Sequence, residues 1–344
     1  MKTTLSSASA LRGLNLLCAL ALAGGSLLAA DAPVPAPVAA PAGQPAAPAP
    51  APGPGLAARG GRGGRGGGPA IPPGPPAPVP AEVAIPRPSP AELTQLNDAL
   101  KKFVATDTSP AKPLLLKYQS MLTVQAPRAN TAIAPSLNPG YMAKHTRNLE
   151  EAKQGDVDIL FMGDSITDNL HGGEHKPVFD QYFGTLKTAN FGIGGDTTQG
   201  VLWRLMNGEG QGFQPKVIQL MIGTNNSGSN TSAEIAEGVG AIVLEMRKDF
   251  PAAKILLLGI FPRATPGSAA RNTVLGANAI IAKLDDRQHV FYLDIGAKFL
   301  DANGMIPSDV MADSPPLHPT AKGDTLWFEA VKEPLANLLK GVAP

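Results

Sequence analysis

Three polar residues, Ser165, Asn225 and His318, are placed where predicted strands and helices would bring them together. Ser165 lies in GDSITD (residues 163–168), after an apolar run and at the expected start of a helix. Its hydroxyl would face solvent there, beside backbone N–H groups that can hold an anion. Asn225 lies in GTNN (223–226) after another apolar run, and its amide can donate to an oxyanion. His318 precedes the last predicted helix. A hydroxyl, a base and oxyanion donors are the components of nucleophilic acyl transfer.

Each motif also has a purely structural interpretation. A Gly-Asp-Ser turn is a common helix N-cap, an asparagine in a turn can bond its own backbone, and a single loop histidine can be inert. The glycines of NFGIGGD (190–196) let the backbone approach a ligand closely. They do not form a dinucleotide-binding motif, because Gly192 and Gly194 begin the Gly-x-Gly-x-x-Gly pattern but its third position is Thr197.

A possible metal motif is present at HGGEH (residues 171–175), which matches the His-x-x-Glu-His string of a zinc peptidase class. That chemistry needs both histidines on one helical face. Two adjacent glycines disfavour a helix here, and no third ligand is evident. The sequence therefore predicts neither a metal nor an organic cofactor.

The elements that would position these residues follow a regular pattern. Short apolar runs predict strands at residues 157–162, 216–222, 254–258 and 290–293, with a further strand near 188–191. Helical spacing predicts helices at 141–154, 199–206, 233–250, 271–284 and 320–339. Near-continuous apolar strands that alternate with amphipathic helices indicate a buried parallel sheet. We therefore predict a three-layer α/β/α sandwich with a flavodoxin-like parallel sheet of about five strands, whose functional groups gather at the carboxyl ends.

The order of the motifs carries more information than any one of them. The stretch from about residue 141 to 339 resembles the SGNH (GDSL-type) hydrolases, in FMGDS (161–165), NFGIGGDTTQGVLWRL (190–205) and GTNN (223–226). It is most similar to the branch typified by the catalytic subunits of intracellular platelet-activating-factor acetylhydrolase. The resemblance implies the SGNH fold and a serine esterase. It implies Ser165 as nucleophile, His318 as general base, and an oxyanion hole of the Ser165 and Gly195 N–H groups and the Asn225 side chain.

The last motif departs from the family pattern, which is usually Asp-x-x-His. Pro315 stands three residues before His318, and the preceding aspartate is Asp313. Three interpretations remain open: Asp313 reaches His318 through an altered turn, a backbone carbonyl orients the imidazole in a Ser–His dyad, or the site is degraded. Asp309 and Asp324 are weaker candidates for the orienting residue.

Composition divides the chain. We predict a signal peptide at residues 1–30, from a basic lead, an apolar run and small residues before a cut near Ala30. Residues 31–88 are rich in Ala, Pro and Gly and predict a disordered linker. Within it, three arginines spaced by glycines suggest a flexible tether rather than a nucleic-acid-binding element. Residues 89–138 predict a capped helix and an irregular segment that pack on or precede the main domain at 139–344.

The balance of charge and the cysteine count exclude other classes. The 29 basic and 28 acidic residues give a net charge of +1, so no general field attracts nucleic acid, and membrane contact is expected only through the cleaved signal. The single cysteine, Cys18, lies in the predicted signal, which excludes disulfides and thiolate catalysis in the mature chain.

Together these features predict an exported serine esterase, periplasmic, envelope-associated or extracellular. It would act on short acyl groups, with acetyl groups on a carbohydrate or cell-wall polymer as the first expectation and a (lyso)phospholipid as the second. A thioester is a further possibility for this scaffold. The alternative from another class is a catalytically impaired glycan-binding module, suggested only by the absence of aspartate at position 315.

Overall fold

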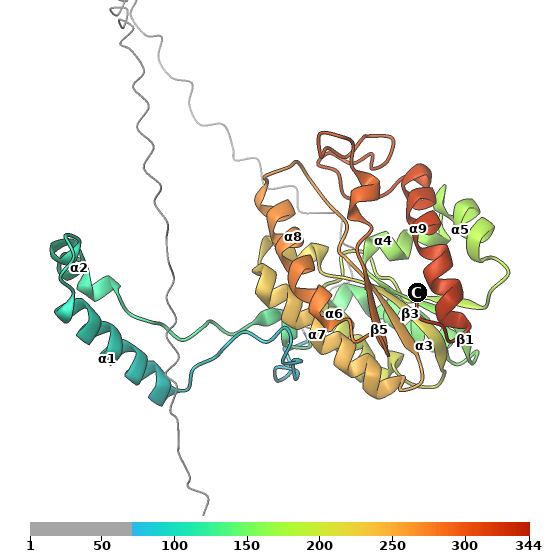
Figure 1. Cartoon of the computed structure of the whole chain (residues 1–344). Coiled ribbons are helices and arrows are strands. Elements are labelled where there is room, and N and C mark those ends of the chain that lie inside the picture. Colours follow the sequence, from blue (N-terminus) through green and yellow to red (C-terminus); the bar gives the residue numbers. More distant parts are fainter. Residues whose placement is uncertain (1–70) are drawn as a thin grey trace, which may run out of the picture. The chain divides into compact units, whose positions relative to one another are not determined.

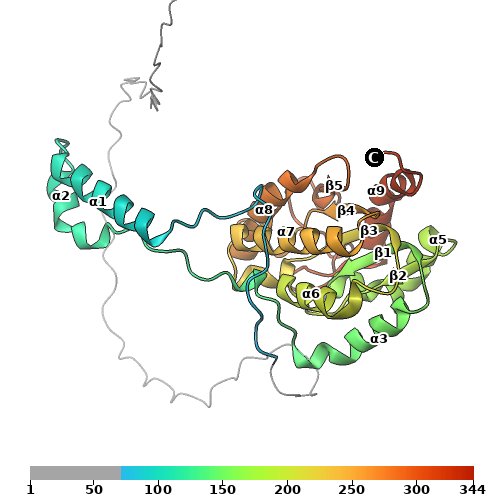
Figure 2. The same ribbon diagram turned by 90° about the horizontal axis from the view of Figure 1, so that it is seen from below.

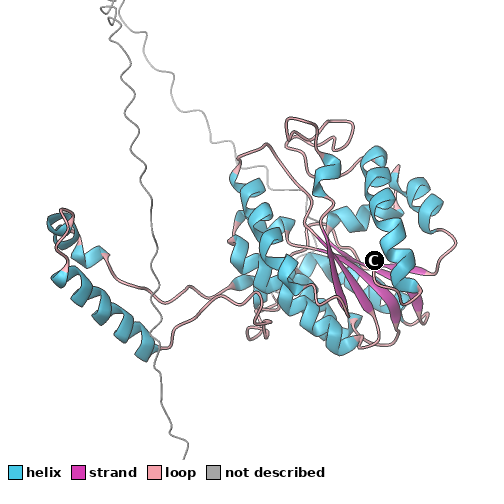
Figure 3. Ribbon diagram, in the orientation of Figure 1, coloured by secondary structure: helices cyan, strands magenta, loops and turns pink. Residues whose placement is uncertain are grey.

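A computed structural model describes residues 71–344 of the chain, so the predicted signal peptide and the linker up to residue 70 lie outside the described residues. The centre of the fold is a five-stranded parallel sheet with strand order β2-β1-β3-β4-β5 (Figures 1 and 3). This is the predicted flavodoxin-like order, and the predicted fold class is confirmed. The strands are β1 (Val157–Gly163), β2 (Thr188–Asn190), β3 (Pro215–Met221), β4 (Lys254–Leu258) and β5 (Val290–Leu293).

Helices cover both faces of this sheet (Figures 1 and 2). One face carries α3 (Met142–Ala152), α6 (Thr198–Arg204), α7 (Ser232–Asp249) and α8 (Ala269–Ile281). The other face carries α5 (His175–Phe183) and α9 (Ala321–Leu339), and the short helix α4 (Ser165–Asp168) follows β1. Successive strand residues alternate between the two cores: Leu160 packs with α7, whereas Phe161 packs with α5 and α9. This period of two is what buries every strand on both sides.

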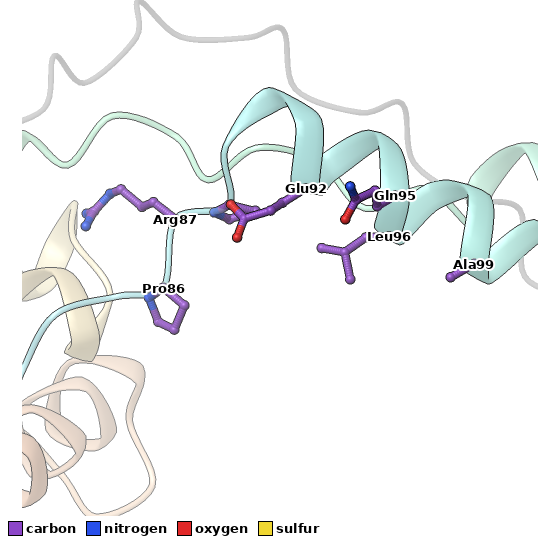
Figure 4. A pocket seen from close by; sticks show the side chains of 7 residues that line it. Pro86, Arg87, Glu92, Gln95, Leu96 and Ala99 are labelled. Atoms are coloured by element: carbon purple, nitrogen blue, oxygen red, sulfur yellow. The ribbon is translucent and has the colours of Figure 1, made fainter.

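The segment before the sheet contains two helices, α1 (Pro90–Thr106) and α2 (Lys112–Lys117), which pack on each other. The predicted capping box at the start of α1 is present, because the Ser89 hydroxyl accepts from the Glu92 N–H and the Glu92 carboxylate accepts from the Ser89 N–H. Figure 4 shows a pocket lined by residues 86–88 and by α1 residues that include Leu96 and Ala99, and none of the predicted site residues lines it. Within residues 71–344, no helix is both long and apolar enough to cross a bilayer.

The prediction of a disordered linker is wrong for residues 71–88, which pack on the sheet domain. Ala77 and Val83 are buried in the core, and the Ala77 N–H donates to the Ile133 carbonyl at 2.8 Å. The Arg87 guanidinium binds the buried Glu237 carboxylate of α7 through two bonds of 2.6 and 2.5 Å. A buried carboxylate needs such partners, so the segment is held where its composition alone would leave it free.

The end of the predicted irregular segment at residues 89–138 packs on the sheet domain, which is one of the two arrangements that the sequence left open. Asn130, Ala132 and Ile133 are buried, and the short 3-10 turn Thr131–Ile133 contacts α6 and α7. Asn130 donates to the Glu237 carboxylate at 2.8 Å. The domain therefore includes both the 71–88 segment and the residues just before α3.

Candidate functional site

The tight connection between β1 and α4 leaves Ser165 partly accessible to solvent. Asp164, between them, is the N-cap of α4, and its carboxylate accepts from the Ile166 N–H at 3.0 Å. Gly163 ends β1, and a Cβ at this position would lie 2.3 Å from Thr167 Oγ1 and 2.6 Å from the Met221 carbonyl oxygen. Only glycine allows this close approach of strand and helix. The Ser165 Oγ lies 2.8 Å from His318 Nε2.

Asp313 occupies the other side of the imidazole. Its Oδ2 lies 2.6 Å from His318 Nδ1 and also accepts from the His318 backbone N–H at 2.8 Å. Because an ionised carboxylate only accepts, Nδ1 carries the proton and Nε2 is free to accept from the Ser165 hydroxyl. Of the orientations left open by the sequence, this is the one in which Asp313 reaches His318.

The loop between Asp313 and His318 explains how a separation of five residues can work. Met311 and Pro319 form an isolated antiparallel bridge, so the chain between them doubles back on itself. The other candidate aspartates bind elsewhere: Asp309 pairs with Lys322 at 2.5 Å, and Asp324 bonds His175 at 2.6 Å.

The predicted oxyanion donors lie at the ends of neighbouring strands. Ser165 follows β1, Gly195 follows β2 and Asn225 follows β3, and these strands are adjacent in the order β2-β1-β3. Within residues 71–344, the N–H groups of Ser165 and Gly195 donate to no protein acceptor, whereas the neighbouring Gly194 N–H is bound to Asp168 at 2.9 Å. Two unused N–H groups beside a serine hydroxyl are suited to an anionic oxygen.

Asn225 is held against the loop that carries Gly195. Its Nδ2 donates to the Asp196 carbonyl oxygen at 2.7 Å, which occupies one of its two amide hydrogens and orients the other. Gly195 itself has a φ of +83°, in the left-handed region that favours glycine. The three predicted donors therefore come from loops that are fixed to one another.

A buried charged network behind this loop was missed by the sequence prediction. Asp196 accepts from Arg204 Nε at 2.9 Å, and the Arg204 guanidinium also binds Glu209. Glu209 in turn contacts His145 at 2.9 Å and Asn148 at 3.1 Å. Burial raises the pKa of Asp196, and the positive charge of Arg204 opposes that rise. No local pattern in the sequence signals the network, because its members come from α3, α6, the loop after β2 and the π-helical turn Leu205–Glu209 after α6.

Two acidic residues next to the nucleophile have distinct environments. Burial raises the pKa of Asp164 to about 7, while the positive charge of Arg263 opposes the rise. Asp168, at the end of α4, pairs with Lys144 and holds the Gly194 N–H. The sequence prediction assigned no role to Asp164 or Asp168, although both stand in the GDSITD motif.

The two histidines of HGGEH have different surroundings. His171 ends a 3-10 turn and packs edge-on against Phe179, with ring centroids 4.7 Å apart. His175 begins α5 and contacts Asp324 through Nδ1 at 2.6 Å. They do not share a helical face, and residues 71–344 contain no group of three or more His, Cys, Asp or Glu side chains arranged to hold a metal ion.

Known proteins share this chain's sequence over the sheet domain. The model of the GDSL-like Lipase/Acylhydrolase family matches residues 161–326. Platelet-activating factor acetylhydrolase IB subunit alpha2 of Rattus norvegicus is 36% identical over 201 residues, which cover 58% of this chain and 85% of that protein. The corresponding subunit of Gallus gallus is 38% identical over 174 residues, covering 50% and 74%. Among solved structures, a putative platelet activating factor from Streptococcus pneumonia is 22% identical, covers 56% of this chain and 94% of its own, and has a TM-score of 0.46.

Proposed function

The chain belongs to the GDSL-like lipase/acylhydrolase family and is a carboxylic-ester hydrolase, and from this premise we propose that Ser165, His318 and Asp313 form its catalytic triad. The observation that carries the proposal is the continuous contact from Ser165 Oγ to His318 Nε2 at 2.8 Å and from His318 Nδ1 to Asp313 Oδ2 at 2.6 Å. A nucleophile bonded to a base, with the base bonded to an orienting carboxylate, is the arrangement that activates a serine hydroxyl.

The proposed reaction has two steps. The Ser165 hydroxyl attacks the ester carbonyl carbon while His318 Nε2 takes its proton, and Asp313 stabilises the resulting imidazolium. The negative charge that forms on the carbonyl oxygen is held by the N–H groups of Ser165 and Gly195 and by the Asn225 amide. His318 then returns the proton to the departing alcohol, which leaves an acyl-enzyme. Water, deprotonated by the same imidazole, releases the carboxylic acid and regenerates Ser165.

We further propose that the acyl group is short, with acetyl as the first choice. Relatives that are 36 and 38% identical are named acetylhydrolases, which supports this choice. For the alcohol side, an acetylated carbohydrate is the first proposal, since the predicted signal and the Ala/Pro/Gly-rich tract suit a protein that works on an envelope or extracellular polymer. A (lyso)phospholipid is the second, from the platelet-activating factor in the name of the same relatives.

The glycan-binding alternative has lost the observation that favoured it. It was based on the absence of aspartate at position 315, but Asp313 occupies the place beside His318 Nδ1 at 2.6 Å. The hydrolase proposal therefore stands alone as the function that the geometry supports.

Hydrolysis of p-nitrophenyl acetate by the full-length chain tests the proposed nucleophile. Ser165→Ala is expected to abolish turnover and labelling by a fluorophosphonate, because both need the serine oxygen. Ser229→Ala is the matched control: its hydroxyl makes only contacts of 3.5 Å, to Asn226 and Asn230, and activity should be unchanged. Turnover or labelling that persists in Ser165→Ala would refute the assignment. Acetylated xylo-oligosaccharides and acetylated phospholipids, compared by kcat/KM, then separate the two alcohol classes.

Export is a separate proposal with its own measurement. Expression in a bacterial host, followed by mass spectrometry of the N-terminus in the secreted and periplasmic fractions, is expected to find a chain that begins close to Asp31. A chain that keeps Met1 and remains in the cytoplasmic fraction would contradict it.

A further inference from the structure

Tyr141 lies against the loop that carries Gly195, although neither the sequence motifs nor the triad involve it. It ends the 3-10 turn Pro139–Tyr141, immediately before α3. A Cβ built on Gly195 would lie 2.5 Å from the Tyr141 Oη, so the phenol occupies the space that a side chain at position 195 would take. The Tyr141 hydroxyl is therefore next to the residue whose free N–H is the proposed oxyanion donor.

The hydrogen of this hydroxyl is unused by the protein. Within residues 71–344, no acceptor is recorded for the Tyr141 O–H; its one side-chain partner is the Asn138 amide, and the ring is half-buried. By contrast, the Tyr182 O–H donates to Glu329 at 2.5 Å. A hydroxyl that is partly open to solvent and donates to no protein acceptor is free to donate to a ligand beside the reaction site.

The phenol also stays in its donor form. Burial raises the pKa of Tyr141, the negative charge of Asp196 raises it further, and a contact from Asn138 opposes the rise. Because the pKa is moved upward from an ordinary value of 10.0, the hydroxyl remains protonated at neutral pH.

We propose that Tyr141 is a further catalytic residue, whose Oη–H donates a hydrogen bond to the substrate's carbonyl oxygen as it becomes the oxyanion over Gly195. This inference rests on the proposed function, because it assumes that the ester carbonyl lies between the Ser165 and Gly195 N–H groups. The phenol adds a neutral donor, fixed in advance, to the N–H groups and the Asn225 amide, and a fixed donor requires no reorganisation when charge develops. The proton stays on Tyr141, and no bond to it is broken.

A competing role for Tyr141 is steric. A ring at this position can also limit the length of the acyl group without any hydrogen bond. The two roles predict different variants: Tyr141→Phe removes only the oxygen and keeps the ring, whereas Tyr141→Ala removes both.

The test measures kcat and KM for p-nitrophenyl acetate with the full-length chain. Tyr141→Phe is expected to lower kcat by about tenfold to a hundredfold, with KM within about twofold, because the donor acts on charge that is present only in the transition state. The affinity for a trifluoromethyl ketone, which forms a charged adduct with the serine, should fall by the same factor. Tyr182→Phe is the matched control, since it removes a hydroxyl from α5, and both constants should stay at the wild-type values.

The outcomes separate this inference from the proposed function. Ser165→Ala that retains full activity would overturn the proposed function itself. If Ser165→Ala is inactive but Tyr141→Phe keeps the wild-type kcat and ketone affinity, only the role of Tyr141 is overturned. In that case, a Tyr141→Ala variant that accepts longer acyl chains would assign the residue the steric role. Thermal unfolding of Tyr141→Phe at the wild-type temperature confirms that any loss of kcat comes from the missing hydroxyl.

Discussion

Replacing Asp313 by alanine tests whether this carboxylate orients the catalytic base. In the structure its Oδ2 holds both His318 Nδ1, at 2.6 Å, and the His318 backbone N–H, at 2.8 Å. Asp313→Ala removes both bonds at once. The imidazole can then rotate, and it can place its proton on Nε2, where it blocks acceptance of the Ser165 proton.

The size of the effect follows from how exposed the pair is. Disabling a buried triad aspartate lowers kcat by about 10⁴-fold. An exposed ion pair contributes at most about 1 kcal/mol, roughly fivefold. Here 31% of the His318 side chain and 43% of the Asp313 side chain are accessible to solvent, which places the pair between these limits. We therefore expect Asp313→Ala to lower kcat/KM by about 10²-fold, equivalent to about 2.7 kcal/mol of transition-state stabilisation.

The assay is p-nitrophenyl acetate hydrolysis under conditions where kcat/KM is measured directly. Asp309→Ala is the matched control, because Asp309 lies in the preceding residues of the same loop region but binds Lys322 rather than His318. That variant should stay within about twofold of wild type, as expected for an exposed ion pair. If Asp313→Ala also stays within about threefold, with Ser165→Ala inactive, the argument from geometry to orientation is refuted, and the enzyme works as a Ser–His dyad.

Three further predictions concern the support of the site. Gly195→Ala should lower kcat by at least tenfold in the ester assay, because its Cβ would lie 2.5 Å from the Tyr141 Oη and its φ of +83° is strained for alanine. Asp164 has a pKa of about 7 in the folded chain against an ordinary value of 3.8, so the stability it provides below pH 3.8 is lost as the pH rises through 7. Calorimetry of Asp164→Asn should therefore show a smaller fall in Tm between pH 5 and 8 than wild type, and an equal fall would contradict this. Arg87→Ala should lower the free energy of unfolding in urea by about 2 kcal/mol, because the buried Glu237 loses its charged partner, and an unchanged midpoint would show that residues 71–88 do not stabilise the domain.

The sheet was predictable because its signals are local. The run from Ile159 to Met162 is apolar on both faces of the strand, which is what a central parallel strand requires. The helix α5 was not predicted, because the two adjacent glycines before it disfavour a helix. Phe179 and Phe183, four residues apart, pack on Phe161, and this spacing was the available signal.

The role of residues 71–88 was not predictable from composition. Ala- and Pro-rich sequence lacks the apolar area that usually orders a chain. What orders it here is a partner 150 residues away, since Arg87 supplies the charge that the buried Glu237 needs. Only the packing of α7 reveals that this carboxylate is buried, so the prediction failed at the level of tertiary contacts rather than local propensity.

In the candidate site, too, some residues could be assigned from the sequence and others could not. Ser165, Gly195 and Asn225 could be assigned because their motifs resemble those of the SGNH hydrolases. Each also follows the carboxyl end of a strand, and the order of adjacent parallel strands brings such ends together. The role of Asp313 could not be decided from the sequence. The usual spacing of aspartate and histidine presumes one loop conformation, whereas the bridge between Met311 and Pro319 closes a loop in which Asp313 and His318 are five residues apart.

Tyr141 could not be found at all from the motifs, since it comes from the turn before α3 and approaches the site from outside the sheet. The sequence nevertheless contains one signal of its position, which is the glycine at position 195. Glycine at position 195 is explained only in part by backbone conformation, because the phenol oxygen also fills the space where a Cβ would stand. A glycine in an oxyanion loop can thus be required by the close approach of a side chain from elsewhere in the chain, as well as by the close approach of a substrate.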